Sequence, residues 1–226
     1  MVMVRFEDRL MAMISKDKSL LFVRVPTTAC SAVETLLHAS GAFQWLGEKH
    51  MNLTDLENLG LVNSETMQKT RKIRGVRNPF DLMVSAYFKN HTYKLRDRMG
   101  WIRKVPGLEI ELRAARKMDF RSWIRWLAEV RHLDVVYYRT ALRYHDKRFD
   151  HVIRFEQLTG DLGTAFDGLA CTDGLPRKKG QIELPQVGVN PNRDRKYAGY
   201  YDEETQSMVE RVARDDIRRF GYAFGS

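Results

Sequence analysis

The sequence predicts an α/β fold of three layers, in which helices flank a central, parallel β-sheet. Two segments, residues 20–40 and residues 72–95, each show the order of strand, turn and helix. The first begins with Leu20–Val25, a short, mainly apolar run that ends at Pro26 and is typical of a strand buried in a parallel sheet. Two such units indicate right-handed crossovers on one sheet, whose ligands bind beyond the carboxyl ends of the strands.

The first unit continues from this strand through a turn into a helix. Ser31–Glu34 has the pattern of a capping box, which predicts the start of the helix. Val33, Leu36 and Leu37 form its apolar face, and Gly41 is a natural stop.

The second unit carries the most distinctive pattern, at residues 74–87. Pro79 fits the first turn of a helix because it lacks an N–H group, and Asn78 before it can cap that helix. Ser85 follows the cap by two turns, so its hydroxyl lies on the same face, within reach of Arg77. A guanidinium, a hydroxyl and a helix N-terminus at one place would bind a dianionic phosphate well. A well-capped helix with a surface arginine explains the spacing equally well.

Further elements follow from the periodicity of the apolar residues. Leu53–Leu61 predicts a short helix, and the aromatic stripe of Phe120–Leu127 predicts a helix with a buried face. His151–Phe155 indicates another strand, followed by a helix from about Asp161. The last helix is expected over residues 202–221, with an aspartate as its cap.

Length and composition favour a single domain over residues 1–226, with a variable insertion at about 89–130. The net charge of +9 suits an anionic ligand, a nucleic acid or an anionic membrane without choosing among them. Two cysteines are too few for a disulfide framework, and the sequence shows no signal peptide and no membrane span. We therefore expect a soluble, cytoplasmic protein; the sequence does not indicate an oligomeric state.

The segments Val76–Asp81 and Val84–Tyr87 resemble the part of sulfotransferases that binds the 3′-phosphate of 3′-phosphoadenosine 5′-phosphosulfate, the sulfuryl donor PAPS. The resemblance implies the P-loop-like sulfotransferase fold, with Arg77 and Ser85 as the contacts of that phosphate. It also implies adenosine 3′,5′-bisphosphate as the product and no metal ion. Arg154–Leu158 and the C-terminal tail resemble the carbohydrate-type branch, which implies the hydroxyl group of a glycan or glycolipid as the acceptor. The resemblance also implies that the insertion at about 89–130 lies on the acceptor side.

In sulfotransferases the first strand leads into a loop of the form Pro-Lys-x-Gly-x-Thr/Ser, which binds the 5′-phosphosulfate. Pro26–Ala32 occupies this place, with Thr27 instead of the lysine that neutralises the departing phosphate oxygen. Ala29 and Cys30 replace small residues or glycine, whereas Ser31 keeps a hydroxyl at the entrance of the helix. The resemblance assigns the donor contacts of this loop to Thr27, Thr28, Ala29, Cys30, Ser31 and Ala32. A plain turn with Ser31 as a cap would need no ligand.

Transfer to a hydroxyl group needs a base, and histidine suits that role near neutral pH. Lys49-His50 resembles the pair that carries the catalytic histidine of small-molecule sulfotransferases, which implies His50 as the base. His91 is the second candidate, and Glu34 the third, because some carbohydrate sulfotransferases use a carboxylate. An isolated histidine is more often structural.

Near the C-terminus, the basic segment 188–197 resembles the sulfotransferase loop that closes over the nucleotide, and Arg195 could contact the donor. Simple solvation explains these charges at least as well.

Two other classes of function remain open. Thr27 is compatible with a nucleotide-binding, non-catalytic homologue of sulfotransferases. The charge alone is compatible with a basic RNA-binding module, although the sequence contains no nucleic-acid motif and we expect no specific nucleic-acid partner. The Walker A pattern of ordinary ATP- and GTP-using enzymes is absent from the sequence.

Overall fold

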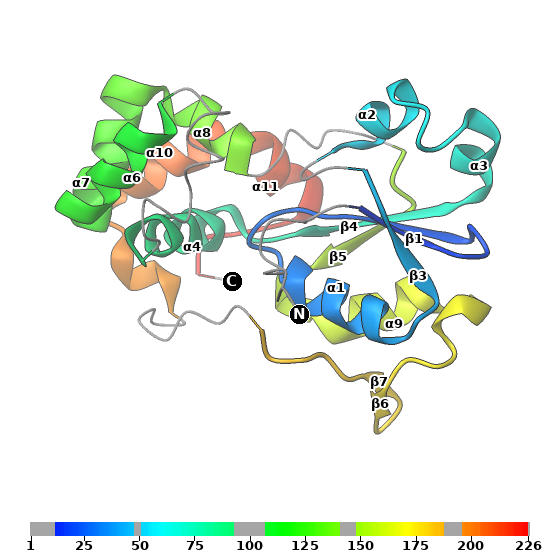
Figure 1. Cartoon of the computed structure of the whole chain (residues 1–226). Coiled ribbons are helices and arrows are strands. Elements are labelled where there is room, and N and C mark those ends of the chain that lie inside the picture. The colour runs from blue at the N-terminus through cyan, green and yellow to red at the C-terminus, as the bar shows by residue number, and fades with distance from the viewer. Residues whose placement is uncertain (1–11, 48–50, 93–106, 141–147, 188–195, 226) are drawn as a thin grey trace, which may run out of the picture. The chain divides into compact units, whose positions relative to one another are not determined.

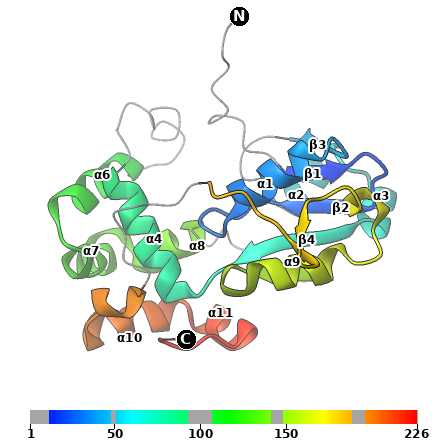
Figure 2. The ribbon, with the colours of Figure 1, turned by 90° about the horizontal axis from the view of Figure 1, so that it is seen from below.

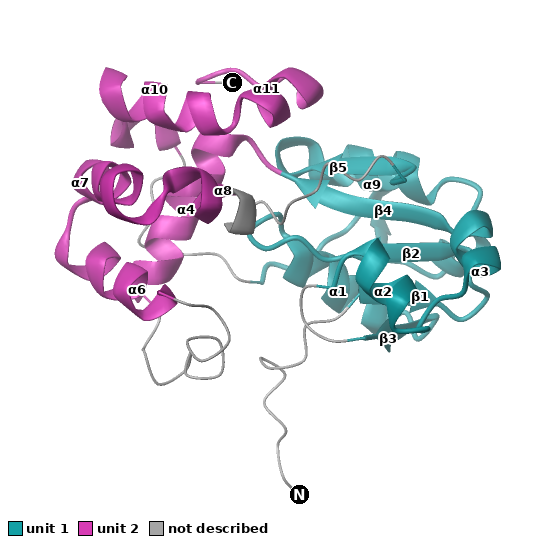
Figure 3. Cartoon of the chain, turned by 90° about the horizontal axis from the view of Figure 1, so that it is seen from above, with its two compact units in different colours: residues 1–76, 144–188 teal, residues 77–143, 189–226 magenta. Residues whose placement is uncertain are grey.

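The computed structural model describes residues 12–47, 51–92, 107–140, 148–187 and 196–225 (Figure 1). The chain divides into two compact units, each built from two separate segments (Figure 3). Unit 1 contains residues 1–76 and 144–188, and unit 2 contains residues 77–143 and 189–226. The expectation of one domain with an insertion at about 89–130 stays a prediction.

Unit 1 contains, within the described residues, a sheet of five strands in the order β3-β1-β2-β4-β5. The strands are β1 (Ala12–Ser15), β2 (Leu20–Val23), β3 (Phe43–Leu46), β4 (Arg71–Val76) and β5 (His151–Arg154). β2, β4 and β5 run parallel, as predicted, whereas β1 is antiparallel to both β2 and β3. The sheet is therefore mixed, because the polar turn at residues 16–19 joins β1 to β2 as a hairpin.

Helices cover both faces of this sheet (Figure 1). α1 (Cys30–Ala39) and α9 (Leu158–Phe166) pack on one face, where Leu36 and Leu162 share a buried cluster with Phe22 and Ile73. α2 (Leu53–Asn58) and α3 (Ser64–Lys69) lie on the other face, where Lys72 of β4 donates to a carbonyl of α3. The predicted α/β fold with helices on both faces of the sheet is confirmed.

The remaining elements of unit 1 are short. They are the 3₁₀ helices η4 (Phe155–Gln157) and η5 (Ala170–Thr172), and the hairpin of β6 (Arg177–Lys178) and β7 (Gln181–Ile182). The helix expected from about Asp161 begins three residues earlier, at Leu158. In addition, the single short helix expected after residue 53 is followed by a second helix, α3.

Every secondary-structure element that the structure describes in unit 2 is a helix (Figure 2). Its elements are α4 (Pro79–Thr92), α6 (Leu108–Lys117), α7 (Phe120–Trp126), the π-helix η3 (Leu127–Arg131), α8 (Leu133–Thr140), the 3₁₀ helix η6 (Tyr197–Tyr200), α10 (Glu203–Val212) and α11 (Arg214–Phe220). The predicted aromatic stripe is confirmed, since Phe120, Trp123, Ile124 and Leu127 are all buried. The expected last helix is interrupted at Ala213 and forms two helices.

None of the helices in the described ranges combines the length and apolar character that a membrane-spanning helix requires.

Candidate functional site

The first loop joins β2 to α1 and takes an uncommon backbone conformation. Thr27 has a φ angle of 65° and Ala29 one of 57°, so two non-glycine residues lie in the left-handed region. Such a conformation costs about 1–2 kcal/mol for each residue with a β carbon. Hydrogen bonds hold the loop in place, because Thr27 Oγ1 donates to Pro26 O at 2.6 Å and Thr28 Oγ1 to Val25 O at 2.8 Å.

The predicted capping box at Ser31–Glu34 is wrong. α1 begins at Cys30, and its N-cap is Ala29, which makes no side-chain hydrogen bond to the first turn. Glu34 faces Arg24 instead, with Arg24 Nη1 3.3 Å from Glu34 Oε2, and both side chains are buried. The entrance of α1 therefore keeps the unsatisfied donors that attract an anion to a helix N-terminus.

Arg24 contributes two further contacts at this entrance. Its Nε donates to Cys30 Sγ at 3.1 Å, and its Nη2 donates to Ser31 Oγ at 3.3 Å. The sequence offers Arg24 as one cation that could serve in place of the missing lysine, but it does not predict the contacts with Cys30 and Ser31. The available signal was a single cation at the end of an otherwise apolar strand, since a buried charge requires a specific partner.

The second loop places Arg77 beside Ser85, as the spacing predicts. Arg77 Nη1 donates to Ser85 Oγ at 3.2 Å, and Asn78 Oδ1 caps α4 by accepting from the N–H group of Phe80 at 3.1 Å. Arg77 Nε also pairs with Asp81 Oδ2 at 2.6 Å. The sequence analysis missed this partner, although the spacing of four residues on a helix was the signal for it.

Burial and geometry make the second loop suitable for a phosphate group. The side chains of Arg77 and Asp81 are 5% and 9% exposed, so the carboxylate fixes the guanidinium against the first turns of α4. Ser85 Oγ accepts from Arg77, which leaves the O–H of Ser85 to donate elsewhere. A hydroxyl, a guanidinium and the N-terminus of a fourteen-residue helix then lie together.

The segment that ends unit 2 supports the start of α4. Asn78 Nδ2 donates to Tyr197 Oη at 3.1 Å and to Ala223 O at 3.0 Å. The ring of Phe224 packs edge-on against Phe80 at a centroid distance of 5.0 Å, and Tyr201 Oη donates to Phe80 O at 2.8 Å. Asn78, the residue next to Arg77, is thus fixed through its own side chain and through the contacts of Phe80.

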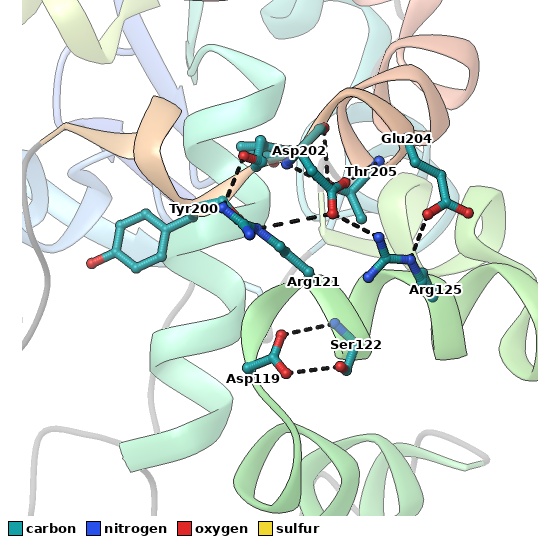
Figure 4. A network of polar contacts seen from close by, with 9 residues as sticks. Asp119, Arg121, Ser122, Arg125, Tyr200, Asp202, Glu204 and Thr205 are labelled. Atoms are coloured by element: carbon teal, nitrogen blue, oxygen red, sulfur yellow. Dashed lines mark hydrogen bonds and ion pairs between the residues drawn. The ribbon is translucent and has the colours of Figure 1, made fainter.

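A polar network within unit 2 joins α7 to α10 (Figure 4). Arg125 Nη2 lies 2.6 Å from Asp202 Oδ2, and Arg125 Nε lies 2.6 Å from Glu204 Oε2. Hydrogen bonds from the side chain and backbone of Thr205, together with Arg125, lower the pKa of Asp202 to about 2. Asp202 also caps α10, as the sequence predicts, so this network fixes the position of α10 on α7.

The structure describes only two of the three candidate bases, and it does not describe the predicted donor contact Arg195. His50 and Arg195 lie outside the described residues. His91 is exposed near the end of α4, with its ring 5.9 Å from that of Tyr87. Glu34 is engaged by the buried Arg24, so its carboxylate is already compensated. The choice of His50 as the base stays a prediction.

A cavity of about 440 Å³ lies elsewhere in unit 1, lined by Glu57, Ser64, Met67, Gln68, Lys72 and Arg148. Lys72 is near the amino end of β4, whereas ligands of parallel sheets bind beyond the carboxyl ends. This cavity is therefore separate from the first loop. Within the described ranges, no group of three or more histidine, cysteine, aspartate or glutamate side chains is placed to hold a metal ion.

Comparison with protein families gives one clear result. The sequence model of the sulfotransferase family matches residues 11–223, which includes both loops described above. The chain therefore belongs to the sulfotransferase family, the transferases that move a sulfuryl group to a hydroxyl-bearing acceptor. The family resemblance of the Arg77 segment is confirmed in this general form. Comparisons with curated proteins and with solved structures give no match.

Proposed function

We propose that this sulfotransferase takes its sulfuryl group from PAPS and transfers it to a hydroxyl group of a carbohydrate or glycolipid. The observation that carries the proposal is the contact of 3.2 Å between Arg77 Nη1 and Ser85 Oγ at the N-terminus of α4. Two fixed donors beside a positive helix end suit a dianionic phosphate, and in PAPS the 3′-phosphate is that group.

The first loop supplies the donors for the other end of the nucleotide. PAPS, when bound, provides the activated sulfuryl group. We propose that residues 27–32 contact its 5′-phosphosulfate, chiefly through the uncapped first turn of α1 and the Ser31 hydroxyl. The fit is supported by Arg24 Nη1, a buried donor that makes no hydrogen bond within the described residues. Arg195 is proposed as a further contact of the nucleotide.

The remaining chemistry belongs to the acceptor and its base. The acceptor oxygen forms the new bond to sulfur, the bond between sulfur and the 5′-phosphate oxygen breaks, and the acceptor proton passes to the base. We assign this base to His50, because an imidazole accepts a proton near neutral pH. The carbohydrate class of acceptor rests on Arg154–Leu158, which spans the end of β5 and η4 in unit 1.

Calorimetry with adenosine 3′,5′-bisphosphate tests the donor assignment. We expect the bisphosphate to bind at least about tenfold more tightly than AMP, because a charge-assisted phosphate contact contributes about 1.5–3 kcal/mol. Equal affinity for the two nucleotides would contradict the assignment. If the protein does not bind the bisphosphate but binds an RNA with an affinity that falls steeply as salt is added, the RNA-binding module is favoured instead.

A transfer assay separates an active enzyme from a non-catalytic homologue. Purified protein is incubated with PAPS and a panel of glycans, glycolipids and phenols, and formation of the bisphosphate is followed. We expect turnover with the carbohydrate acceptors and little with the phenols. Transfer to phenols alone would contradict the proposed acceptor class. Tight binding of PAPS without transfer to any acceptor would favour the non-catalytic homologue.

A further inference from the structure

A buried arginine lies against the first turn of α1. Arg24 directly follows β2 and is 7% exposed. Side chains alternate along a strand, so Arg24 continues the face of Leu20 and Phe22, which packs on α1. The guanidinium is therefore directed at the helix entrance.

The contacts of Arg24 leave part of its hydrogen-bonding capacity unused. Nε donates to Cys30 Sγ and Nη2 to Ser31 Oγ, while Nη1 lies 3.3 Å from Glu34 Oε2. Nη1 is fully buried and donates no hydrogen bond to any described residue. Because guanidinium has five N–H donors and no acceptor, Arg24 can donate to a further oxygen at this entrance in addition to its ion pair with Glu34.

The charges around this guanidinium favour a further anion. A cation at a helix N-terminus meets the positive end of the helix dipole, which is unfavourable without compensation. Glu34 offsets one charge, and the N-cap residue Ala29 has no side-chain acceptor for the first turn of α1. A phosphate group would accept hydrogen bonds from the uncapped turn and would offset the helix end.

We propose that Arg24 supplies the positive charge that the first loop lacks at Thr27, and that the anion it serves is the 5′-phosphate end of the nucleotide. This inference rests on the proposed function. Arg24 acts as a positioning residue as well, because Ser31 Oγ accepts from Nη2. The O–H group of Ser31 must then point away from Arg24. It could donate to an anion that is bound at the first turn of α1.

Calorimetry with two nucleotides tests the inference. The ratio of the dissociation constants of adenosine 3′-monophosphate and adenosine 3′,5′-bisphosphate reports what the 5′-phosphate contributes. The double variant Arg24→Met/Glu34→Leu replaces both partners of the ion pair by apolar residues, which proteins tolerate better than removal of one partner. We expect this ratio to fall about tenfold or more, the loss typical of a charge-assisted contact, while the affinity for the 3′-monophosphate stays unchanged.

Two single variants serve as matched controls. Glu34→Gln keeps the guanidinium and removes the negative charge, so the ratio should stay the same or rise. Arg24→Lys keeps the charge and should retain most of the ratio. An ion pair with only a structural role would lower the affinity for both nucleotides together in all these variants. Circular dichroism confirms that each variant is folded.

The outcomes distinguish a failure of the role of Arg24 from a failure of the proposed function. A folded double variant with the parental ratio, or a Glu34→Gln variant that loses the ratio, would overturn the role of Arg24 alone. A parent protein that binds the bisphosphate no better than adenosine would contradict the proposed function, and this inference with it. If the double variant does not fold, Arg24→Gln/Glu34→Gln replaces it, and the same fall in the ratio is expected; the parental ratio would again overturn the role of Arg24.

Discussion

Thr28 and Gly75 approach each other so closely that a β carbon on Gly75 would lie 2.3 Å from Thr28 Oγ1 and 2.7 Å from Thr28 Cβ. Thr28 belongs to the first loop, and Gly75 lies in β4, both within unit 1. Because Gly75 has no side chain, Thr28 and the first loop can lie against β4. No other residue type leaves this space free.

Gly75→Ala should therefore lower the free energy of unfolding by about 1–3 kcal/mol, because overpacking forces the loop to move. Urea unfolding measures the change. Gly163→Ala is the control within the same unit, since its β carbon would meet nothing within 4 Å in the helix α9. That variant should gain up to about 1 kcal/mol of stability, as expected for glycine in a helix. Equal effects of the two substitutions would disprove the steric explanation.

Arg77→Ala should weaken binding of adenosine 3′,5′-bisphosphate by about 1.5–3 kcal/mol, because a charge-assisted hydrogen bond is lost. The affinity for AMP should not change, since AMP lacks the 3′-phosphate. Calorimetry with both nucleotides measures the difference. Arg113→Ala is the control, because Arg113 is an exposed arginine on α6 of the same unit. An equal loss of affinity for AMP and the bisphosphate would show that Arg77 has another role.

His50→Ala should lower turnover by about 10² to 10⁴, while the affinity for the bisphosphate stays nearly unchanged, because a general base acts in the transition state. The assay follows bisphosphate formation with an accepted glycan. His91→Ala is the control and should retain the parental rate. A His50→Ala variant with parental turnover would leave His50 a structural role and return His91 and Glu34 to consideration.

Thr27→Lys tests whether the first loop already contains its cation. In the parent protein we expect turnover to change by less than about threefold, because we propose that Arg24 already stabilises the charge on the departing oxygen. In the Arg24→Met/Glu34→Leu background, the same substitution should restore most of the lost turnover. Lysine adds little backbone strain here, since Thr27 already has a φ angle of 65°. A large increase in the parent would mean that the loop lacks a working cation.

Asp202→Asn should reduce the loss of stability in acid. The pKa of Asp202 falls from its ordinary value of 3.8 to about 2 in the folded protein. Its contribution to stability is therefore complete above about pH 4 and is lost as the pH falls towards about 2. Asparagine keeps the cap of α10 but does not titrate. Urea unfolding at several pH values compares the two proteins; identical slopes in this range would contradict the prediction.

Local patterns predicted much of the fold and the second loop. The contact of Arg77 with Ser85 follows from helix periodicity alone, and the buried stripe of Phe120 and Trp123 follows from the same rule. The parallel strand β2 was recognisable because it is a short apolar run. Each of these features depends on residues within two or three turns of one another.

Contacts set by packing between elements were not predictable in this way. Glu34 fits a capping box in sequence, but Arg24 competes for it once β2 packs on α1. The strand β1 is only four residues long, so no local period marks it, and besides its hairpin with β2 it pairs with the distant strand β3. The attachment of Asn78 to Ala223 joins residues 145 positions apart and leaves no trace in either segment.

This last attachment also determines when unit 2 can finish folding on the ribosome. The entrance of α4 emerges early, but Ala223, which binds the side chain of Asn78, is translated 145 residues later. At about 5–20 residues per second, the interval is roughly 7–30 s. During that time the side chain of Asn78 lacks its partner Ala223 and the ring of Phe80 lacks its partner Phe224, while the strands β5, β6 and β7 of unit 1 are synthesised. We therefore expect the nascent chain to depend on chaperones longest at the segment that carries Arg77.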